Sequence, residues 1–249
     1  MQKTGEGKPS GLSDQAKFYQ KPILLLMGAP GVGKGTFGKM LSEDYGMPIF
    51  STGEYLRELA KSNDQSELVK KIREIMKEGK LVDDATIQKI IERRLFEDEP
   101  KNAKGIILDG YPRTTPQAQL LDKTGKVKAA VNFFLKENIL VEKLAGRREC
   151  EKCRTPYNIS SIKKEGYDMD PLLPKKNQEI CDKDGGKLIQ REDDTEKVII
   201  ERLKTYKEKT KPLEDYYKSK GVLFEFEPKQ GVKEYPTVKK MMDQFIATH

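Results

Sequence analysis

Several residue types that would indicate particular protein classes are scarce in this chain of 249 residues. It has no tryptophan, three cysteines and a single histidine, His249, which is the last residue and leaves no obvious imidazole for acid–base catalysis. No apolar run approaches the roughly 20 residues of a membrane-spanning helix, so we expect no membrane partner. The cysteines are odd in number and clustered, which argues against a secreted disulfide framework and favours a reducing compartment, by default the cytoplasm.

The start of the chain also lacks targeting signals. The first 20 residues are polar, contain no arginine and include Glu6 and Asp14. Signal peptides need an apolar core, and mitochondrial presequences are rich in arginine and poor in acidic residues. We therefore expect residues 1–20 to form a flexible extension.

Positive charge is in excess but is not concentrated. Lysine and arginine number 47 against 40 aspartates and glutamates, which gives a formal net charge of +7. Because the excess is spread along the chain, it is compatible with small anionic ligands and predicts no nucleic-acid partner. We expect a monomer.

Short apolar runs alternate with charged segments that have helical periodicity. The runs typical of strands are 23–27, 47–50, 105–108, 129–135 and 222–226. The segments typical of helices are 35–45, 66–77, 86–96 and 194–211. This alternation predicts an α/β fold with a parallel sheet covered on both faces by helices.

A glycine-rich segment, GAPGVGKGT at 28–36, follows the first expected strand and precedes a helix. It fits the phosphate-loop pattern G-x-x-x-x-G-K-[ST] except that Thr36 stands one position late. Glycines allow a tight turn in which successive N–H groups point at phosphate oxygens, and Lys34 would reach the terminal phosphates. We expect the triphosphate to be bound by Gly31, Val32, Gly33, Lys34, Gly35 and Thr36.

Three further segments indicate which reaction the nucleotide-binding loop serves. They are STGEYLR at 51–57, GKLV at 79–82, and DGYPR at 109–113 with Gln117 four residues later. Together with the phosphate loop, their order and spacing resemble the adenylate kinase family across nearly the whole chain after residue 21. The resemblance implies a P-loop, doubly wound, five-stranded fold with an AMP-binding helical insert and a lid. It also implies Mg²⁺-dependent, reversible phosphoryl transfer from ATP to AMP, giving two ADP.

The resemblance assigns roles to individual residues. Arg57 and Arg113 would bind the AMP phosphate, and Gln117 the adenine. The complete set implied for AMP is Thr52, Arg57, Lys80, Leu81, Val82, Gly110, Arg113, Gln117, Arg191 and Arg202. The implied catalytic set is Lys34, Arg113, Arg147, Arg191 and Arg202, and Arg147 and Gln230 would also contact ATP. Asp109 can hold Mg²⁺ through water.

The chemistry agrees with the scarcity of histidine. The acceptor is a phosphate oxyanion, which is already nucleophilic at neutral pH, so no general base is needed. The reaction needs positive charge around the phosphoryl group, and arginines with Mg²⁺ supply it.

All three cysteines lie in a stretch with few apolar residues, which cannot build a core alone. Cys150 and Cys153 form C-x₂-C, and Cys181 and Asp184 repeat the spacing as C-x₂-D. Two such pairs offer four ligands for a tetrahedral, structural Zn²⁺ with no open position. The arrangement resembles the zinc-bearing lid of bacterial adenylate kinases. Asp182 breaks the spacing and fits less well.

The motifs divide the chain into four parts. The core kinase domain comprises 21–50, 83–147 and 192–249. The AMP-binding insert is 51–82, the zinc-binding lid is 148–191, and the extension is 1–20.

Two positions depart from the family pattern and leave the donor base open. Lys143 stands where an arginine normally stacks on that base, and an ammonium lacks the planar surface of guanidinium. The sequence near Gln230 also differs. A GTP:AMP phosphotransferase, or a kinase for another monophosphate, remains an alternative, although the long lid disfavours the short-lid UMP/CMP kinases. A zinc-knuckle, nucleic-acid-binding ATPase is a more remote alternative.

Overall fold

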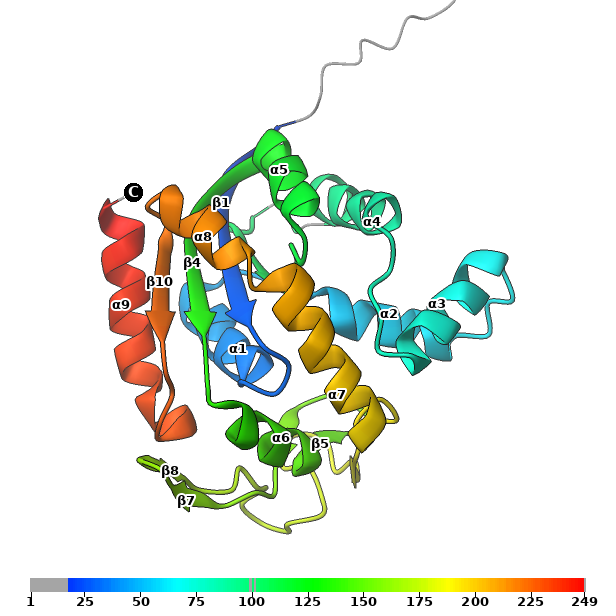
Figure 1. Ribbon diagram of the computed structural model, residues 1–249, viewed down its shortest axis with the longest axis vertical. Helices are drawn as coiled ribbons and strands as arrows, with labels where there is room; N and C mark the ends of the chain where they lie inside the picture. Colours follow the sequence, from blue (N-terminus) through cyan, green and yellow to red (C-terminus); the bar gives the residue numbers. More distant parts are fainter. Residues whose placement is uncertain (1–17, 99, 101, 249) are drawn as a thin grey trace, which may run out of the picture.

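A five-stranded, all-parallel sheet forms the centre of the molecule, with the strand order β10-β4-β1-β3-β2 (Figure 1). The computed structural model describes residues 18–98, 100 and 102–248, so His249 and most of the expected extension lie outside it. The strands are β1 (Tyr19–Gly28), β2 (Ile49–Ser51), β3 (Ile106–Asp109), β4 (Gly125–Phe133) and β10 (Leu223–Phe226). The predicted parallel α/β sheet is confirmed.

The central strand, β1, is longer than the sequence indicates. Its apolar run is buried on both faces, with no exposed surface on Ile23, Leu24 or Leu25. The strand begins at Tyr19 and not at the expected Ile23, because the Tyr19 ring is buried edge-on against Phe96. The first two residues of this strand therefore fall inside the segment that we expected to be a flexible extension.

Helices cover both faces of the sheet, as in a doubly wound fold. Leu24 and Leu26 face a cluster that includes α1 (Lys34–Tyr45), α6 (Glu137–Ala145) and α9 (Tyr235–Thr248). On the opposite face, Ile23 and Leu25 meet α4 (Asp84–Phe96), α5 (Thr115–Thr124) and α8 (Leu213–Ser219). The alternation along one strand thus supplies both cores.

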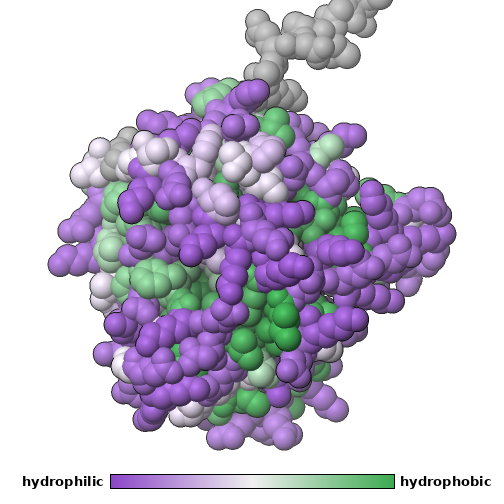
Figure 2. Space-filling view, viewed as in Figure 1, coloured by the Kyte–Doolittle hydropathy of each residue, from purple (hydrophilic) through white to green (hydrophobic). Residues whose placement is uncertain are grey.

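Two helices, α2 (Thr52–Lys61) and α3 (Glu67–Lys77), project from the sheet as a helical arm (Figure 1). A serine directly before each helix caps it, because its hydroxyl accepts a backbone N–H, Ser51 from Glu54 and Ser66 from Val69. The surface of the arm is mostly hydrophilic in Figure 2. Both helices of the arm lie within the segment 51–82, where the sequence predicts an insert.

The cysteine-bearing insert folds into two small antiparallel pieces. One is a sheet of β5 (Arg147–Cys150), β6 (Pro156–Asn158) and β9 (Leu188–Ile189), and the other is a hairpin of β7 (Ile162–Lys164) and β8 (Tyr167–Met169). The buried cluster of the insert itself comprises Cys150, Tyr157 and Cys181. The apolar side chains of the hairpin pack instead into the main core. This packing agrees with the prediction that the cysteine-bearing insert cannot build a core alone.

The helix expected over 194–211 is interrupted. It consists of α7 (Glu196–Thr205) followed by a π-helical turn, Tyr206–Thr210, after which α8 begins. Pro212 follows the turn and cannot donate the backbone hydrogen bond that would continue an α-helix. A short 3₁₀ turn, Gly231–Glu234, leads into α9. None of the helices that the structure describes is both long and apolar enough to span a membrane.

Candidate active site

The glycine-rich loop lies between β1 and α1, at the point where the strand order reverses. Its backbone is packed too tightly for side chains. A Cβ on Gly28 would lie 2.1 Å from the carbonyl oxygen of Phe133, and one on Gly31 would lie 2.6 Å from Leu144. Both glycines also have positive φ angles. The loop is thereby held against β4 and α6 with the N-terminus of α1 open to an anion.

Lys34, the first residue of α1, turns back onto this loop. Its Nζ donates to the carbonyl oxygens of Gly28 at 2.7 Å and Ala29 at 2.9 Å. Burial lowers the pKa of Lys34 to about 8, against a smaller opposing effect of Asp109 and alongside repulsion from Arg113. A bound phosphate would therefore stabilise the charged form of Lys34.

A cavity of about 170 Å³ extends from the loop and is rich in positive charge. Its lining residues come from the loop, the helical arm, the insert and α7. The cations among them are Lys34, Arg57, Arg113, Lys143, Arg147, Arg191 and Arg202. The carboxylates among them are Glu54, Asp109 and Asp170. The surplus of cations indicates a site for polyanionic ligands.

Burial makes the charged form of three arginines in this cavity less favourable, and for Arg57 and Arg202 neighbouring arginines add to the effect. Burial, and next the neighbouring Arg191, lower the pKa of Arg57 to about 10. Burial likewise lowers the pKa of Arg202 to about 9, with Arg147 as the next cause. The pKa of Arg113 is also lowered by burial. Such shifts mean that bound anions would stabilise guanidinium charges that burial disfavours.

Two consecutive aspartates hold the arginines in place. Arg147 Nε donates to Asp194 Oδ2 at 2.7 Å. Arg202 Nη1 donates to Asp193 Oδ2 at 3.0 Å, and Arg57 Nη1 lies 3.8 Å from the same oxygen. The predicted arginines at 57, 113, 147, 191 and 202 all line this one cavity.

A second cavity, of about 70 Å³, lies between the arm and Arg202 of α7. It is lined by Lys80, Leu81 and Val82, as the GKLV motif predicts, and it shares Arg57, Arg113 and Arg202 with the larger cavity. The two cavities therefore meet at arginines.

Two of the predicted acceptor-site residues have buried side chains that are bonded to the protein itself. Thr52 Oγ1 donates to the Gly110 carbonyl oxygen at 2.7 Å. Gln117 bonds through both amide atoms, to Asp84 and to the backbone of Arg113. Sequence reasoning missed Asp84, because an aspartate in the first turn of a helix is usually there for the helix dipole. The Asp83-Asp84 pair directly after the GKLV motif was the available signal.

Asp109 ends β3 beside the phosphate loop and is buried. Its Oδ2 lies 4.0 Å from the position that a Cβ would take on Gly35. A carboxylate oxygen and the hydroxyl of Thr36, which lines the same cavity, are the oxygen ligands that Mg²⁺ prefers. These residues fit a magnesium ion that arrives with a nucleotide.

The far end of the larger cavity is lined by Lys143, Ile162 and Met169, opposite Gly231 and Val232. Lys143 Nζ lies 3.6 Å from the Met169 sulfur, and burial lowers its pKa. The side chain of the predicted contact Gln230 is exposed and is absent from the lining, whereas its two successors are present. The hairpin residues Ile162 and Met169 were not anticipated, because their role depends on how the hairpin packs.

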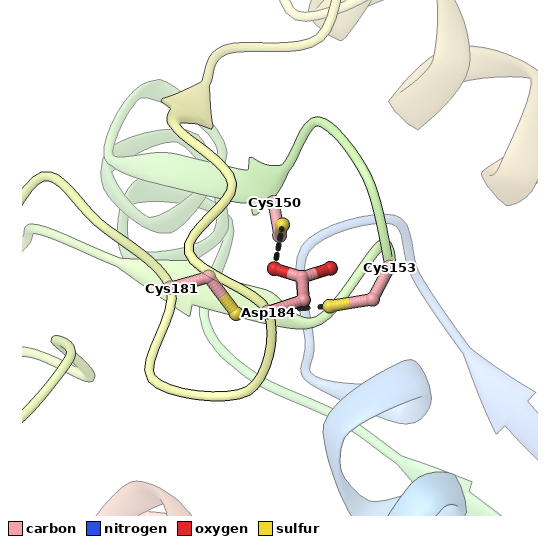
Figure 3. A group of neighbouring side chains, drawn as sticks. All are labelled: Cys150, Cys153, Cys181 and Asp184. Carbon is pink, nitrogen blue, oxygen red and sulfur yellow. Dashed lines mark hydrogen bonds between the residues drawn. The ribbon is translucent and has the colours of Figure 1, made fainter.

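The insert brings together Cys150, Cys153, Cys181 and Asp184 (Figure 3). Their ligand atoms all lie within 4.8 Å of one another. The sulfurs of Cys153 and Cys181 are 3.6 Å apart, and Cys150 Sγ lies 3.2 Å from Asp184 Oδ1. Three sulfurs and one carboxylate oxygen at these separations suit a tetrahedral Zn²⁺ with bonds of about 2.0–2.3 Å. The predicted ligands thus converge on one point, and Asp182 instead accepts backbone N–H groups from Lys175 and Lys176.

A parallel sheet whose first strand ends in a phosphate loop, beside converging arginines, defines a P-loop nucleotide-binding enzyme. Residues 26–222 match the family model described as adenylate kinase, and the chain belongs to the adenylate kinase family. It is a nucleoside monophosphate kinase.

Relatives of known name agree with this assignment. The chain is 43% identical over 205 residues to adenylate kinase of Thermotoga maritima, which covers 80% of this chain and 87% of that protein. It is 41% identical over 217 residues to adenylate kinase 1, chloroplastic, of Arabidopsis thaliana, covering 84% and 73%. It is 38% identical over 228 residues to adenylate kinase of Archaeoglobus fulgidus, covering 90% and 97%.

Proposed function

We propose that this chain catalyses the reversible, Mg²⁺-dependent transfer of the terminal phosphoryl group of ATP to AMP, giving two ADP. The observation that carries the proposal is that two cavities share Arg57, Arg113 and Arg202. One cavity contains the phosphate loop and the other the GKLV motif. A donor bound in the first and an acceptor bound in the second would bring their phosphates together at these arginines.

On the donor side, the N–H groups of residues 31–36 would bind the β- and γ-phosphates at the N-terminus of α1. Lys34 would exchange its two backbone acceptors for phosphate oxygens, which relieves the burial of its charge. Mg²⁺, held through Asp109 and Thr36, would neutralise phosphate charge when it is bound.

On the acceptor side, Arg57 and Arg113 would bind the AMP phosphate. Residues 80–82, with Thr52 and Gly110 beneath them, would enclose the nucleoside, and Gln117 would read the adenine. The AMP phosphate oxyanion attacks the γ-phosphorus directly, so no proton must be removed. Arg147, Arg191 and Arg202 would balance the charge that spreads over the phosphoryl oxygens during transfer.

We also propose that Cys150, Cys153, Cys181 and Asp184 hold a structural Zn²⁺. All four positions of a tetrahedron are filled by protein atoms, so no position is left for a water or a substrate. The small cluster of apolar side chains in this insert supports a stabilising role for the ion. We propose a reducing compartment, the cytoplasm, because three clustered cysteines do not suit a secreted disulfide framework.

The domain organisation follows from these roles. We propose that residues 51–82 and 148–191 close over the bound nucleotides, with 21–50, 83–147 and 192–249 as the core. Closure would exclude water that could otherwise accept the phosphoryl group. We propose that one chain acts alone, because every role in the proposed reaction is assigned to a residue of this chain.

Lys143 leaves GTP as an alternative phosphoryl donor, because this lysine lines the end of the cavity where the donor base would lie. Guanine offers two neighbouring acceptors to such a cation, whereas adenine offers an acceptor next to a donor. Initial rates with ATP and GTP as donors, each combined with AMP, CMP and UMP, test the proposal. We expect ATP with AMP to be the fastest pair. No turnover with AMP from either donor would overturn the proposed function.

A further inference from the structure

The carboxamide of Gln117 is buried and held from both sides. Its side chain is 2% exposed. Its Nε2 donates to Asp84 Oδ1 at 2.6 Å, and its Oε1 accepts from the backbone N–H of Arg113 at 2.7 Å. Asp84 is itself anchored, because Thr114 Oγ1 lies 3.2 Å from both of its carboxylate oxygens.

These neighbours leave one orientation for the amide. A carboxylate can only accept hydrogen bonds, and a backbone N–H can only donate. If the amide turned over, its oxygen would face the Asp84 carboxylate and its NH₂ group would face the N–H of Arg113. Leaving a buried polar group unpaired in this way is unfavourable, so both neighbours oppose the turn. The orientation of Gln117 is therefore fixed by its partners.

The fixed orientation matters for purine recognition. After these two bonds, Nε2 retains one hydrogen and Oε1 retains one lone pair. The edge of adenine offers an acceptor at N1 beside a donor at N6. A 6-oxopurine, such as hypoxanthine or guanine, offers a donor at N1 beside an acceptor at O6. An amide that suits adenine must turn over to suit a 6-oxopurine.

We propose that Asp84 is a positioning residue that fixes the orientation of Gln117 and thereby makes the acceptor site select AMP over 6-oxopurine monophosphates. The proposal rests on the proposed function, in which Gln117 reads the acceptor base. Asp84 acts through Gln117 and need not touch the nucleotide.

The test compares AMP with IMP as acceptors of the enzyme, because IMP reverses the hydrogen-bonding order without adding the amino group of guanine. In Asp84→Asn the new amide can donate as well as accept, so a turned Gln117 finds a partner. We expect the ratio of kcat/KM for AMP over IMP to fall by about tenfold or more, mainly through KM. Asp84→Ala, which removes the carboxylate altogether, should shift the ratio in the same direction.

Asp83→Asn is the matched control, since it removes the same charge one position earlier. Asp83 is exposed and caps α4 by accepting the N–H of Thr86, a role that asparagine also fills. Its AMP-to-IMP ratio should match that of the wild type, and melting temperatures of all variants separate selectivity from folding.

Two results would overturn the proposal. One is an unchanged ratio in an Asp84 variant that folds, even if its melting temperature falls. The other needs no variant, namely a wild-type enzyme that uses IMP as well as AMP. Neither result resembles failure of the proposed function, which would show as no turnover with AMP.

Discussion

Arg147 forms a bidentate ion pair with Asp194 through two of its guanidinium nitrogens. Its Nε donates to Oδ2 at 2.7 Å, and a terminal nitrogen of the guanidinium donates to Oδ1. The side chain of Asp194 has no exposed surface, and its Oδ1 also accepts from Arg202 at 3.3 Å. One buried carboxylate thus positions two of the arginines that face the phosphates.

Asp194→Asn should damage both stability and catalysis. Removing one partner of a buried ion pair leaves charge without compensation, so we expect the free energy of unfolding to fall by about 3 kcal/mol. Turnover should fall by about a hundredfold, because both arginines lose their positions. Urea unfolding and initial rates measure the two effects. Asp215→Asn, at an exposed position of α8, should change neither.

Lys34→Met should abolish turnover without unfolding the protein. The ammonium stabilises transferred phosphate charge, and its loss should cost at least about a thousandfold in kcat. The lysine bonds to loop carbonyls and is destabilised by burial, so methionine should leave the melting temperature unchanged or slightly raised. Circular dichroism and initial rates make the comparison. Activity near the wild-type level would remove this lysine from the mechanism.

Nucleotide affinity should depend on the protonation of Lys34. Burial lowers the pKa of this group to about 8 from 10.5. In the nucleotide-free enzyme the ammonium is therefore lost progressively above pH 8, and ATP affinity should fall as pH rises from 7 to 9.5. Calorimetric titrations across this range, with Lys34→Met as the reference, isolate the effect. A wild-type profile parallel to that of Lys34→Met would show that another group is responsible.

The same shift predicts an opposite trend in stability. Between pH 8 and 10.5 the unfolded chain binds the proton of this lysine and the folded chain does not. The contribution of Lys34 to the free energy of unfolding should therefore increase with pH across this window and be smallest below pH 8. The difference between wild type and Lys34→Met in urea unfolding at pH 7.5 and pH 10 measures it. A difference that does not vary with pH would contradict the lowered pKa.

Metal analysis of the purified chain should find about one zinc per molecule. Cys150→Ser should lose the metal and lower the melting temperature by several degrees, while turnover at low temperature falls less. Asp182→Asn is the control and should keep its zinc, because Asp182 bonds to backbone N–H groups and not to the cluster. If turnover collapsed while stability held, the metal would have a role in the chemistry.

Much of the fold was predictable because its signals are local. Apolar runs mark the five parallel strands, and the boundaries of α1 and α3 lie within one residue of the predicted ranges. The start of β1 was not predictable, because the burial of Tyr19 depends on Phe96, which is far away in the sequence.

The residues of the candidate site likewise divide into those that local sequence predicts and those that it does not. The loop at 28–36 and the three cysteines are contiguous or regularly spaced, and their convergence follows from the motif. The bond between Asp84 and Gln117 joins residues 33 positions apart, and each has an ordinary local explanation. Pairings of this kind depend on tertiary packing, which local pattern does not encode.

The β7–β8 hairpin has a consequence for protein engineering. Ile162, Tyr167 and Met169 are buried in the main core, and the hydroxyl of Tyr167 bonds to Glu227, just after β10. Residues 148–191 are thus not a self-contained unit that could be transplanted into another kinase. A chimera that receives this segment must also receive the surface on which the hairpin rests, or it will expose three large apolar side chains to solvent.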